Sequence, residues 1–440
     1  MKNQIFRRTS GYLLTAAVAA GLSASASAYT LHSENGTELN LDIEAVFGVF
    51  TSKKSYDPIG IRPASDEGRS SWQEGYIKYG LSGSHAYDSG ASVFAGISGV
   101  TSGTWGDGDA GGFTSGNERE TDLEDAYLGW RSGNLIPALG EDGLEFSFGR
   151  QNFSIGDGFL INGDALNFGD ALGPELDRGG AYWLAARKAF DRTAIARIGG
   201  SEGLRADLFW LESDNVAQSK MELAGINAEY VMPEGTFGVA YIEGLDVMDG
   251  GATHRDGQQT LSLRYQGNAG VENLFLSAEY VNQDQGDNTA PDADAWYVEA
   301  GWTFADMPWS PSVNYRYSSF DEGFDPLFFG FNRGYGTWFQ GEVAANYAGP
   351  FNSGTDVHHI GVKANPTEML SVGALYFNFR DTDAGFMDGQ ELDLYAEWVV
   401  TPNLIISPLI GFYKPDSSAV TQLGGNGTNV YGQVIAIVPF

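Results

Sequence analysis

A regular alternation of apolar and polar residues is the feature that most constrains the fold of this chain. In Thr37–Phe50 the apolar side chains share one face: Leu39, Leu41, Ile43, Ala45, Phe47 and Val49, with Asn40, Asp42 and Glu44 on the other. Such period-two patterning predicts a β-strand, and this one is longer than most strands of soluble proteins. The same pattern begins again at Leu204, Leu261, Trp296 and Leu392. The alternation therefore predicts an all-β fold.

The composition indicates where such strands reside. Beyond the first residues, no apolar run reaches the roughly 18 residues of a transmembrane helix. Glycine and aromatic residues are abundant, with Gly 60, Tyr 21, Phe 27 and Trp 10. Hydrophobicity that is spread by alternation is typical of a membrane β-barrel. A soluble periplasmic β-protein is the competing class, because alternation does not show which face is inside.

Three features favour the membrane arrangement. Aromatic residues repeatedly end the apolar faces, as an interfacial girdle requires: Tyr230, Tyr265, Tyr280, Trp302 and Trp398. Tight connections alternate with long ones. The chain also ends on a strand, Val434–Phe440, whose last residue is aromatic and resembles the C-terminal signal of outer-membrane barrels. We expect a transmembrane antiparallel β-barrel with long extracellular loops, located in the bacterial outer membrane.

Short connections belong on the periplasmic side of such a barrel and long ones outside. The tight turns are expected near His85–Asp88, Met232–Gly235, Gly267–Val271, Asp306–Ser310, Asn365–Glu368 and Thr401–Asn403. Arg131–Asp142 fits the same side, and Ala189–Gly203 fits it less cleanly. The long loops are expected at Thr51–Ser70, Ser102–Glu118, Ser154–Asp177, Asp284–Pro291 and Asp381–Gln390. The barrel then closes with an even count of about eighteen strands if Phe324–Val343 is a loop.

The first 28 residues are expected to form a secretory signal. Lys2, Arg7 and Arg8 precede a short apolar run, Gly11–Leu22, and Ala26 and Ala28 form an A-x-A cleavage site. No linker or long repeat follows, so residues 29–440 are expected to form a single outer-membrane barrel.

Charge and residue usage exclude several function classes. The formal net charge is -32 and Cys is 0. An acidic chain is a poor partner for nucleic acid, and a cysteine-free one has no disulfide framework or thiolate site. With His 5 and no G-x-S-x-G motif, no catalytic set can be assembled, so we expect neither an enzyme nor a cofactor. Acidic loop pairs, Asp107 with Asp109 and Asp284 with Asp287, do not complete an EF-hand, and no metal site is predicted.

The segment Phe324–Val343 is the most aromatic part of the chain. The residues considered for recognition in this loop are Asp325, Phe331, Arg333, Tyr335, Trp338 and Phe339. Their aromatic rings offer stacking faces, and the arginine offers a contact for a carboxylate. The alternative is a loop that packs on its neighbours and closes the mouth of the barrel.

At this segment the sequence resembles the alginate-export family of outer-membrane porins, through "FDPLF" and the following "GTWFQGE". The earlier "FGRQNFSIGDGFLINGDALNFG", Phe148–Gly169, resembles a strand end and loop of the same family. The resemblance implies a monomeric barrel of about eighteen strands that passively passes a polysaccharide or small anionic solute. It also implies an arginine-rich constriction, for which Arg150 and Arg333 are the residues matched by position.

The strand phases turn further charged residues inward. Together with Arg150, which the resemblance implies, they are the pore-lining candidates: Arg205, Asp207, Glu229, Arg264, Glu279, Glu299, Arg316, Lys363, Asp393 and Glu397. Either the basic ones gather at a constriction or the charges pair across the lumen as a structural ladder. Without a bulge, Arg150 would follow Phe148 outward, towards lipopolysaccharide phosphates. The loop Ser154–Asp177 is long enough to fold inward and narrow the pore; the alternative is a loop that caps the outer mouth of the barrel.

The sequence thus predicts an outer-membrane channel for polysaccharide or small anionic solutes. A general or carbohydrate-selective porin is one alternative, with aromatic residues stacking on an anionic or neutral saccharide, and a surface binding barrel with a closed lumen is another. The expected partners are outer-membrane lipid and lipopolysaccharide. The substrate, the direction of transport, the ion selectivity and any periplasmic secretion partner are left open by the sequence.

Overall fold

The computed structural model describes residues 29–55, 68–285, 291–330, 333–335, 340–344, 353–380, 388–416 and 426–439. Within these ranges, nineteen strands form one sheet. They are β1 Tyr29–Glu34, β2 Thr37–Ser52, β3 Ser70–Ala86, β4 Ser92–Gly106, β5 Arg119–Arg131, β6 Leu144–Gln151, β7 Phe190–Ile198, β8 Gly203–Glu212, β9 Glu222–Met232, β10 Gly235–Asp246, β11 Gln259–Gly267, β12 Leu274–Asp284, β13 Ala293–Thr303, β14 Ser312–Phe320, β15 Thr355–Thr367, β16 Leu370–Arg380, β17 Gly389–Thr401, β18 Leu404–Pro415 and β19 Asn429–Pro439.

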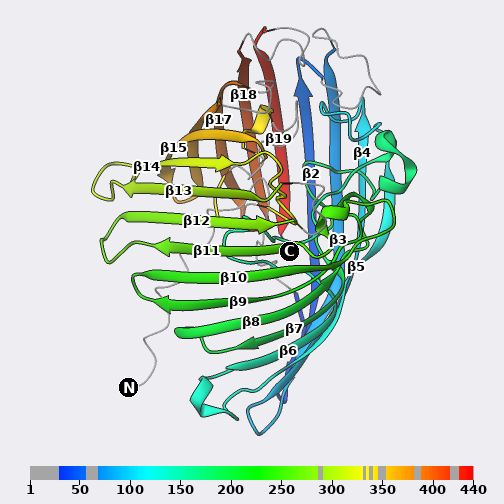
Figure 1. The fold of residues 1–440 in the computed structure, drawn as a ribbon, viewed down its shortest axis with the longest axis vertical. Coiled ribbons are helices and arrows are strands. Elements are labelled where there is room, and N and C mark those ends of the chain that lie inside the picture. The colour runs from blue at the N-terminus through cyan, green and yellow to red at the C-terminus, as the bar shows by residue number, and fades with distance from the viewer. Residues whose placement is uncertain are drawn as a thin grey trace.

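The sheet closes on itself. Each strand from β2 onward pairs antiparallel with the next, and β19 pairs with β2 from Tyr431↔Ser52 to Pro439↔Glu44. β1 stands outside this ring, because it pairs only with the first residues of β2 through a tight Asn35-Gly36 turn. The two turn residues have φ of 52° and 75°, as a type I′ hairpin requires. The barrel therefore has eighteen strands, the even number expected, and successive strands lie side by side in Figure 1.

The connections sort into a short end and a long end. Two-residue turns join β9 to β10, β15 to β16 and β17 to β18, and the turns expected near Asp306–Ser310 and Gly267–Val271 lie at the same end. The loops between β6 and β7 and between β14 and β15 lie at the opposite end. We take the short end as periplasmic and the long end as extracellular. Phe324–Val343 lies between β14 and β15, so its described residues are a loop, as predicted.

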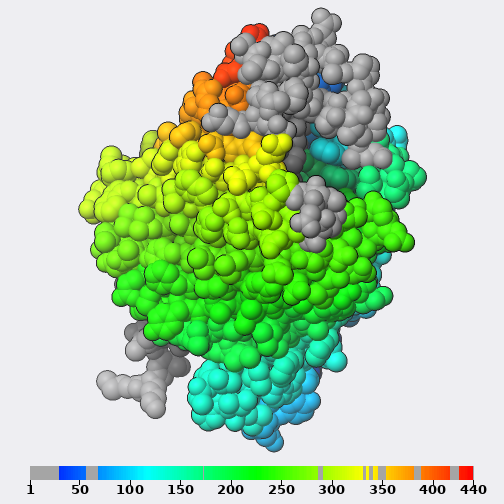
Figure 2. All heavy atoms as spheres, viewed as in Figure 1, coloured from blue at the N-terminus to red at the C-terminus, as the bar shows by residue number. Residues whose placement is uncertain are grey.

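The outer face of the wall is apolar and the inner face polar. Leu263, Val298 and Leu394 point outward, with 48%, 47% and 45% of their surface exposed, whereas Arg316 and Asp393 face inward at 4% and 0%. This is the inverse of a soluble sandwich and matches a wall that faces lipid. In the space-filling view, the strands coloured green to yellow form one continuous surface (Figure 2). No helix in the described part of the chain is long and apolar enough to span a membrane.

One connection differs from its expected bounds. Ala189–Gly203, which fits the periplasmic side less cleanly than the others, contains strand β7, and only the residues between Ile198 and Gly203 form the turn to β8. The preceding extracellular loop is accordingly longer than Ser154–Asp177 and runs on to Ala189. The cause lies in the local pattern: Ile195 of β7 points inward at 2% exposure, so apolar residues do not mark the lipid face here. Ile195 belongs to an apolar cluster that joins residues of the folded-in loops to the inner face of the wall, where a polar lumen would otherwise lie.

The core of the molecule lies inside the barrel. One apolar cluster joins loop residues such as Phe159 and Phe328 to the inner faces of β7–β14. A second joins Tyr182, Trp183 and Tyr335 to the opposite wall, which includes Trp72. Burial of large side chains between loops and wall is worth about 1.5–3 kcal/mol each. These clusters hold the two long loops within the lumen.

Candidate functional site

The loop between β6 and β7, residues 152–189, is fixed to the wall of β3 and β5 by two buried glutamate side chains. Glu74 accepts hydrogen bonds from the backbone N–H groups of Trp183 at 2.9 Å and Leu184 at 3.1 Å. Glu124 accepts from those of Lys188 at 2.8 Å and Ala189 at 3.2 Å. Each glutamate thereby satisfies two backbone N–H groups of the loop, which would otherwise be left without partners inside the barrel. The predicted inward folding of this loop is therefore observed.

The loop between β14 and β15 meets the first loop inside the barrel. Ile161 and Phe328 form a parallel bridge, and the N–H of Asn162 donates to the carbonyl of Phe328 at 2.7 Å. Arg333 joins the loops to the wall, because its Nε lies 2.9 Å from Asp157 Oδ2 and its Nη2 lies 2.6 Å from Glu299 Oε2. The two loops thus form one inner body that narrows the lumen.

The described members of the recognition group are engaged in this packing. Asp325 accepts a bidentate contact from Arg255, with Nε–Oδ2 at 2.6 Å and Nη2–Oδ1 at 2.7 Å, and His254 Nε2 lies 2.9 Å from Oδ2. Tyr335 stacks on Tyr395 with ring centroids 3.8 Å apart. These contacts favour the packing alternative for Asp325, Arg333 and Tyr335. Phe331, Trp338 and Phe339 lie outside the described residues.

Arg150 turns inward because strand β6 carries a bulge. The register with β7 shifts between Gly149 and Gln151, and Gly149 has a φ of 115° that favours glycine. Arg150 is consequently 6% exposed, and its Nη1 lies 2.7 Å from Asp191 and 2.8 Å from Asp214. The outward alternative for Arg150, with contacts to lipopolysaccharide, is therefore wrong.

The other basic pore-lining candidates also lie against acids. Arg264 is 2.5 Å from Glu229, Arg316 is 3.9 Å from Glu299 and Lys363 is 2.9 Å from Glu397. Arg205 also pairs with Glu229, and Asp207 lies 3.7 Å from Arg197. Of the remaining acidic candidates, Glu279 accepts a hydrogen bond from the Ser262 hydroxyl at 2.6 Å, and Asp393 is fully buried. This arrangement is the structural ladder, not a gathering of unopposed positive charge.

Loop residues add an arginine cluster that the strand phases cannot show. Arg150, Arg178 and Arg187 surround Asp214, at 2.8, 3.2 and 3.7 Å. Burial alone would raise the pKa of Asp214, but the combined charges of Arg178, Arg150 and Arg187 hold it below its ordinary value. Asp122 and Asp164 also face these arginines, at 2.9 Å from Arg187 and 3.3 Å from Arg178. The cluster is therefore internally neutralised.

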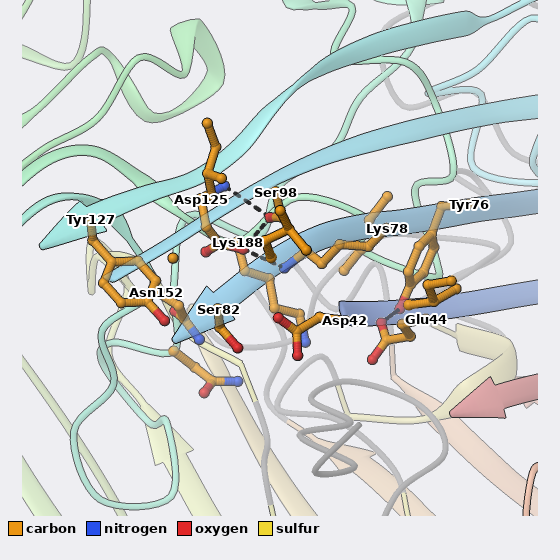
Figure 3. A pocket seen from close by; sticks show the side chains of 17 residues that line it. Asp42, Glu44, Tyr76, Lys78, Ser82, Ser98, Asp125, Tyr127, Asn152 and Lys188 are labelled. Carbon is orange, nitrogen blue, oxygen red and sulfur yellow. Dashed lines mark hydrogen bonds and ion pairs between the residues drawn. The ribbon is translucent and has the colours of Figure 1, made fainter. Parts of the chain in front are cut away.

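A polar cavity of about 350 Å³ lies between the folded-in loop 152–189 and the wall of β2–β5 (Figure 3). The wall contributes Asp42, Glu44, Lys78 and Asp125, and the loop contributes Lys188. The other polar side chains that line it are Tyr76, Ser82, Ser98, Tyr127, Asn152 and Asn162. Charges of both signs around a cavity inside the barrel are suited to contacts with a polar solute.

Some of these charges are already paired. Lys78 Nζ lies 3.3 Å from Asp125 and 3.6 Å from Glu124, and Ser98 donates to Asp125 at 2.5 Å. Tyr76 donates to Glu44 at 2.6 Å. These contacts, drawn for Asp125 and Glu44 in Figure 3, fix the wall side of the cavity.

Sequence reasoning missed most of this cavity. Asp42 and Glu44 stand on the polar face of the first alternating segment, so their inward phase was available. Lys188 and Arg187 belong to a loop without periodicity, and no pattern could place them. Among the described residues, no cluster of His, Cys, Asp and Glu is suited to a metal ion. Asp109, considered for calcium, instead accepts from the Thr114 N–H at 2.6 Å and the Thr114 hydroxyl at 2.7 Å.

Comparisons with known proteins support the fold. No family model matches the chain, and no curated protein does; the resemblance to the alginate-export family is therefore not confirmed. Among solved structures, a BenF-like porin from Pseudomonas fluorescens Pf-5 has a TM-score of 0.60 at 10% identity, over 91% of this chain and 98% of that one. OccD3 (OpdP) of Pseudomonas aeruginosa gives 0.55 at 13%, over 94% and 93%, and OccAB4 of Acinetobacter baumannii gives 0.55 at 12%, over 90% and 97%. The chain thus has the fold of the bacterial outer-membrane porins.

Proposed function

We propose that this protein is an outer-membrane porin that passes small polar solutes through a lumen narrowed by its own two folded-in loops. The observation that carries the proposal is the polar cavity between loop 152–189 and β2–β5, inside a closed barrel with an apolar outer face. Passage through such a lumen needs no cofactor and no covalent chemistry, because width and charge select the solute. We further propose that the mature chain acts as a monomer after removal of residues 1–28.

Export of an acidic polysaccharide, as the resemblance to the alginate-export family implies, is the second candidate. The cluster of Arg150, Arg178 and Arg187 is the observation in its favour. Two points weigh against it: acids neutralise these arginines, and apolar packing holds both loops in the lumen.

The channel is tested in a background that already lacks cysteine. Ser82→Cys places a thiol in the cavity, whereas Ile77→Cys places one on the outer face of the same strand, where Ile77 is 42% exposed. We expect a water-soluble, charged methanethiosulfonate reagent to reduce single-channel conductance in planar bilayers only for Ser82→Cys. Folded protein without conductance would contradict the channel and favour a binding barrel with a closed lumen. Equal responses of the two variants would show that the cavity does not lie on the ion path.

A further inference from the structure

Two charges of opposite sign in the cavity have no partner of their own. Among the described residues, neither the Lys188 ammonium nor the Asp42 carboxylate forms a hydrogen bond or an ion pair, whereas Lys78, Glu44 and Asp125 all do. Figure 3 shows the side chains of Lys188 and Asp42 directed into the same space from the loop and from β2. Unpaired charges in a confined site are costly unless a ligand or water meets them.

The backbone of Lys188 is held rigidly, so its side chain is presented to the cavity from a fixed point. Its N–H donates to Glu124 at 2.8 Å, and its carbonyl accepts from the N–H of Asp164 at 2.9 Å. Burial lowers the pKa of Lys188, and the nearby Lys78 acts in the same direction against the carboxylates of Glu44 and Glu124. An anionic group beside this ammonium would therefore stabilise it.

The charges around the cavity discriminate between solute classes. A simple anion beside Lys188 also meets the carboxylates of Asp42 and Glu44, which repel it. A simple cation beside Asp42 also meets Lys188 and Lys78. A solute that carries both charges satisfies both unpaired groups and avoids both repulsions.

We propose that the cavity is a binding site for a small zwitterion, such as an amino acid. The carboxylate of the zwitterion contacts Lys188, and its ammonium group contacts Asp42. This inference rests on the proposed channel and names its class of solute. Both charges are carried by ordered backbone, since Lys188 is held by its two backbone hydrogen bonds and Asp42 lies within strand β2.

The test compares L-serine and glycerol, two solutes of similar size that carry no net charge. The rate at which each enters is measured by the swelling of vesicles that contain the purified protein. We expect Lys188→Met and Asp42→Asn each to lower the ratio of serine entry to glycerol entry by about threefold. Lys188→Arg, which keeps the charge, should preserve the ratio. Lys53→Met and Asp249→Asn are matched controls, because both residues are exposed and lie outside the cavity, and they should leave both rates unchanged.

The outcomes separate this inference from the channel itself. If the vesicles swell in both solutes and neither substitution lowers the ratio of serine entry to glycerol entry, the zwitterion site is overturned but the channel is not. Parallel changes of both rates, with a constant ratio, also overturn it, because they show only a change in pore width. If the vesicles swell in neither solute, both the proposed channel and the proposed zwitterion site are overturned.

Discussion

At the scale of residues, the interior of this barrel is organised by acidic side chains that fix loops to the wall or to one another. Glu74 and Glu124 bind the backbone of one loop, and Asp325 binds Arg255 from another. The Asp325–Arg255 pair is almost fully buried, at 6% and 8% exposure. Buried pairs of this kind add little net stability over apolar packing, but the removal of one partner is costly.

Asp325→Asn should loosen the loop that begins after β14. The substitution leaves the buried Arg255 without its bidentate partner, at a cost of about 3–5 kcal/mol. We expect faster amide hydrogen exchange at Leu327 and Phe328, whose N–H groups donate to Asp325 and Leu160 at 2.9 and 3.0 Å. Asp256→Asn, at an exposed neighbour of Arg255, is the control. Unchanged exchange in Asp325→Asn would show that apolar packing alone holds the loop.

The same pair gives a pH dependence of defined sign. Burial would raise the pKa of Asp325, but the charge of Arg255 and the hydrogen bonds from His254 and Arg255 hold it below its ordinary value of 3.8. A lowered pKa in the folded state stabilises the fold above that ordinary value, and the contribution is lost as the pH falls further. The difference in opening free energy between wild type and Asp325→Asn should therefore be full at pH 6 and shrink below pH 3.8. A difference that grows towards acid pH would contradict this linkage.

At the scale of elements, the sequence was informative wherever a strand has lipid on one side and a polar lumen on the other. There alternation gave the phase of β8, β11, β13 and β17 correctly, since Leu208, Leu263, Val298 and Leu394 are exposed. It failed at β7, where Ile195 packs on the folded-in loops and the outward residues include small alanines. It also could not place Lys188, because a loop has no period. The missing information is the apolar body inside the barrel, which arises from contacts between distant segments.

The bulge in strand β6 depends on one glycine, Gly149. A Cβ on Gly149 would lie 2.3 Å from the carbonyl oxygen of Ala126, and its φ of 115° is strained for other residues. Gly149→Ala should therefore destabilise the barrel by about 1–3 kcal/mol, measured by urea unfolding in detergent micelles. Gly200→Ala is the matched control, since the nearest atom to its Cβ would be Leu139 O at 3.4 Å. Equal stabilities of the two variants would mean that the bulge can relax without cost.

At the scale of the whole molecule, a barrel of the porin fold combines a rigid wall with an interior set by two loops. The wall is specified by local alternation, but the lumen is specified by which loop residues reach it. For this reason the fold of the wall can be predicted from the sequence more fully than the lining of the lumen. The formal net charge of -32 is likewise a property of the whole chain, and its effect on ions depends on the charges that face the passage.

Those charges predict a weak preference for cations. Asp42, Glu44 and Asp125 line the cavity against Lys78 and Lys188, and the arginine cluster nearby is neutralised by its own acids. We expect the reversal potential across a KCl gradient to favour K⁺ over Cl⁻ at low salt. The preference should decline towards 1 M, where the Debye length is only about 3 Å.

Asp42→Asn should weaken this preference, because it removes the unpaired carboxylate that faces the cavity. Asp249→Asn, in an exposed loop, should leave it unchanged. Anion selectivity in the wild type, with block by oligomeric uronate, would contradict the prediction. It would mean that Arg150, Arg178 and Arg187 determine the ion selectivity at the narrowest point despite their acidic neighbours. Export of an acidic polysaccharide would then be a better proposal than the small-solute channel.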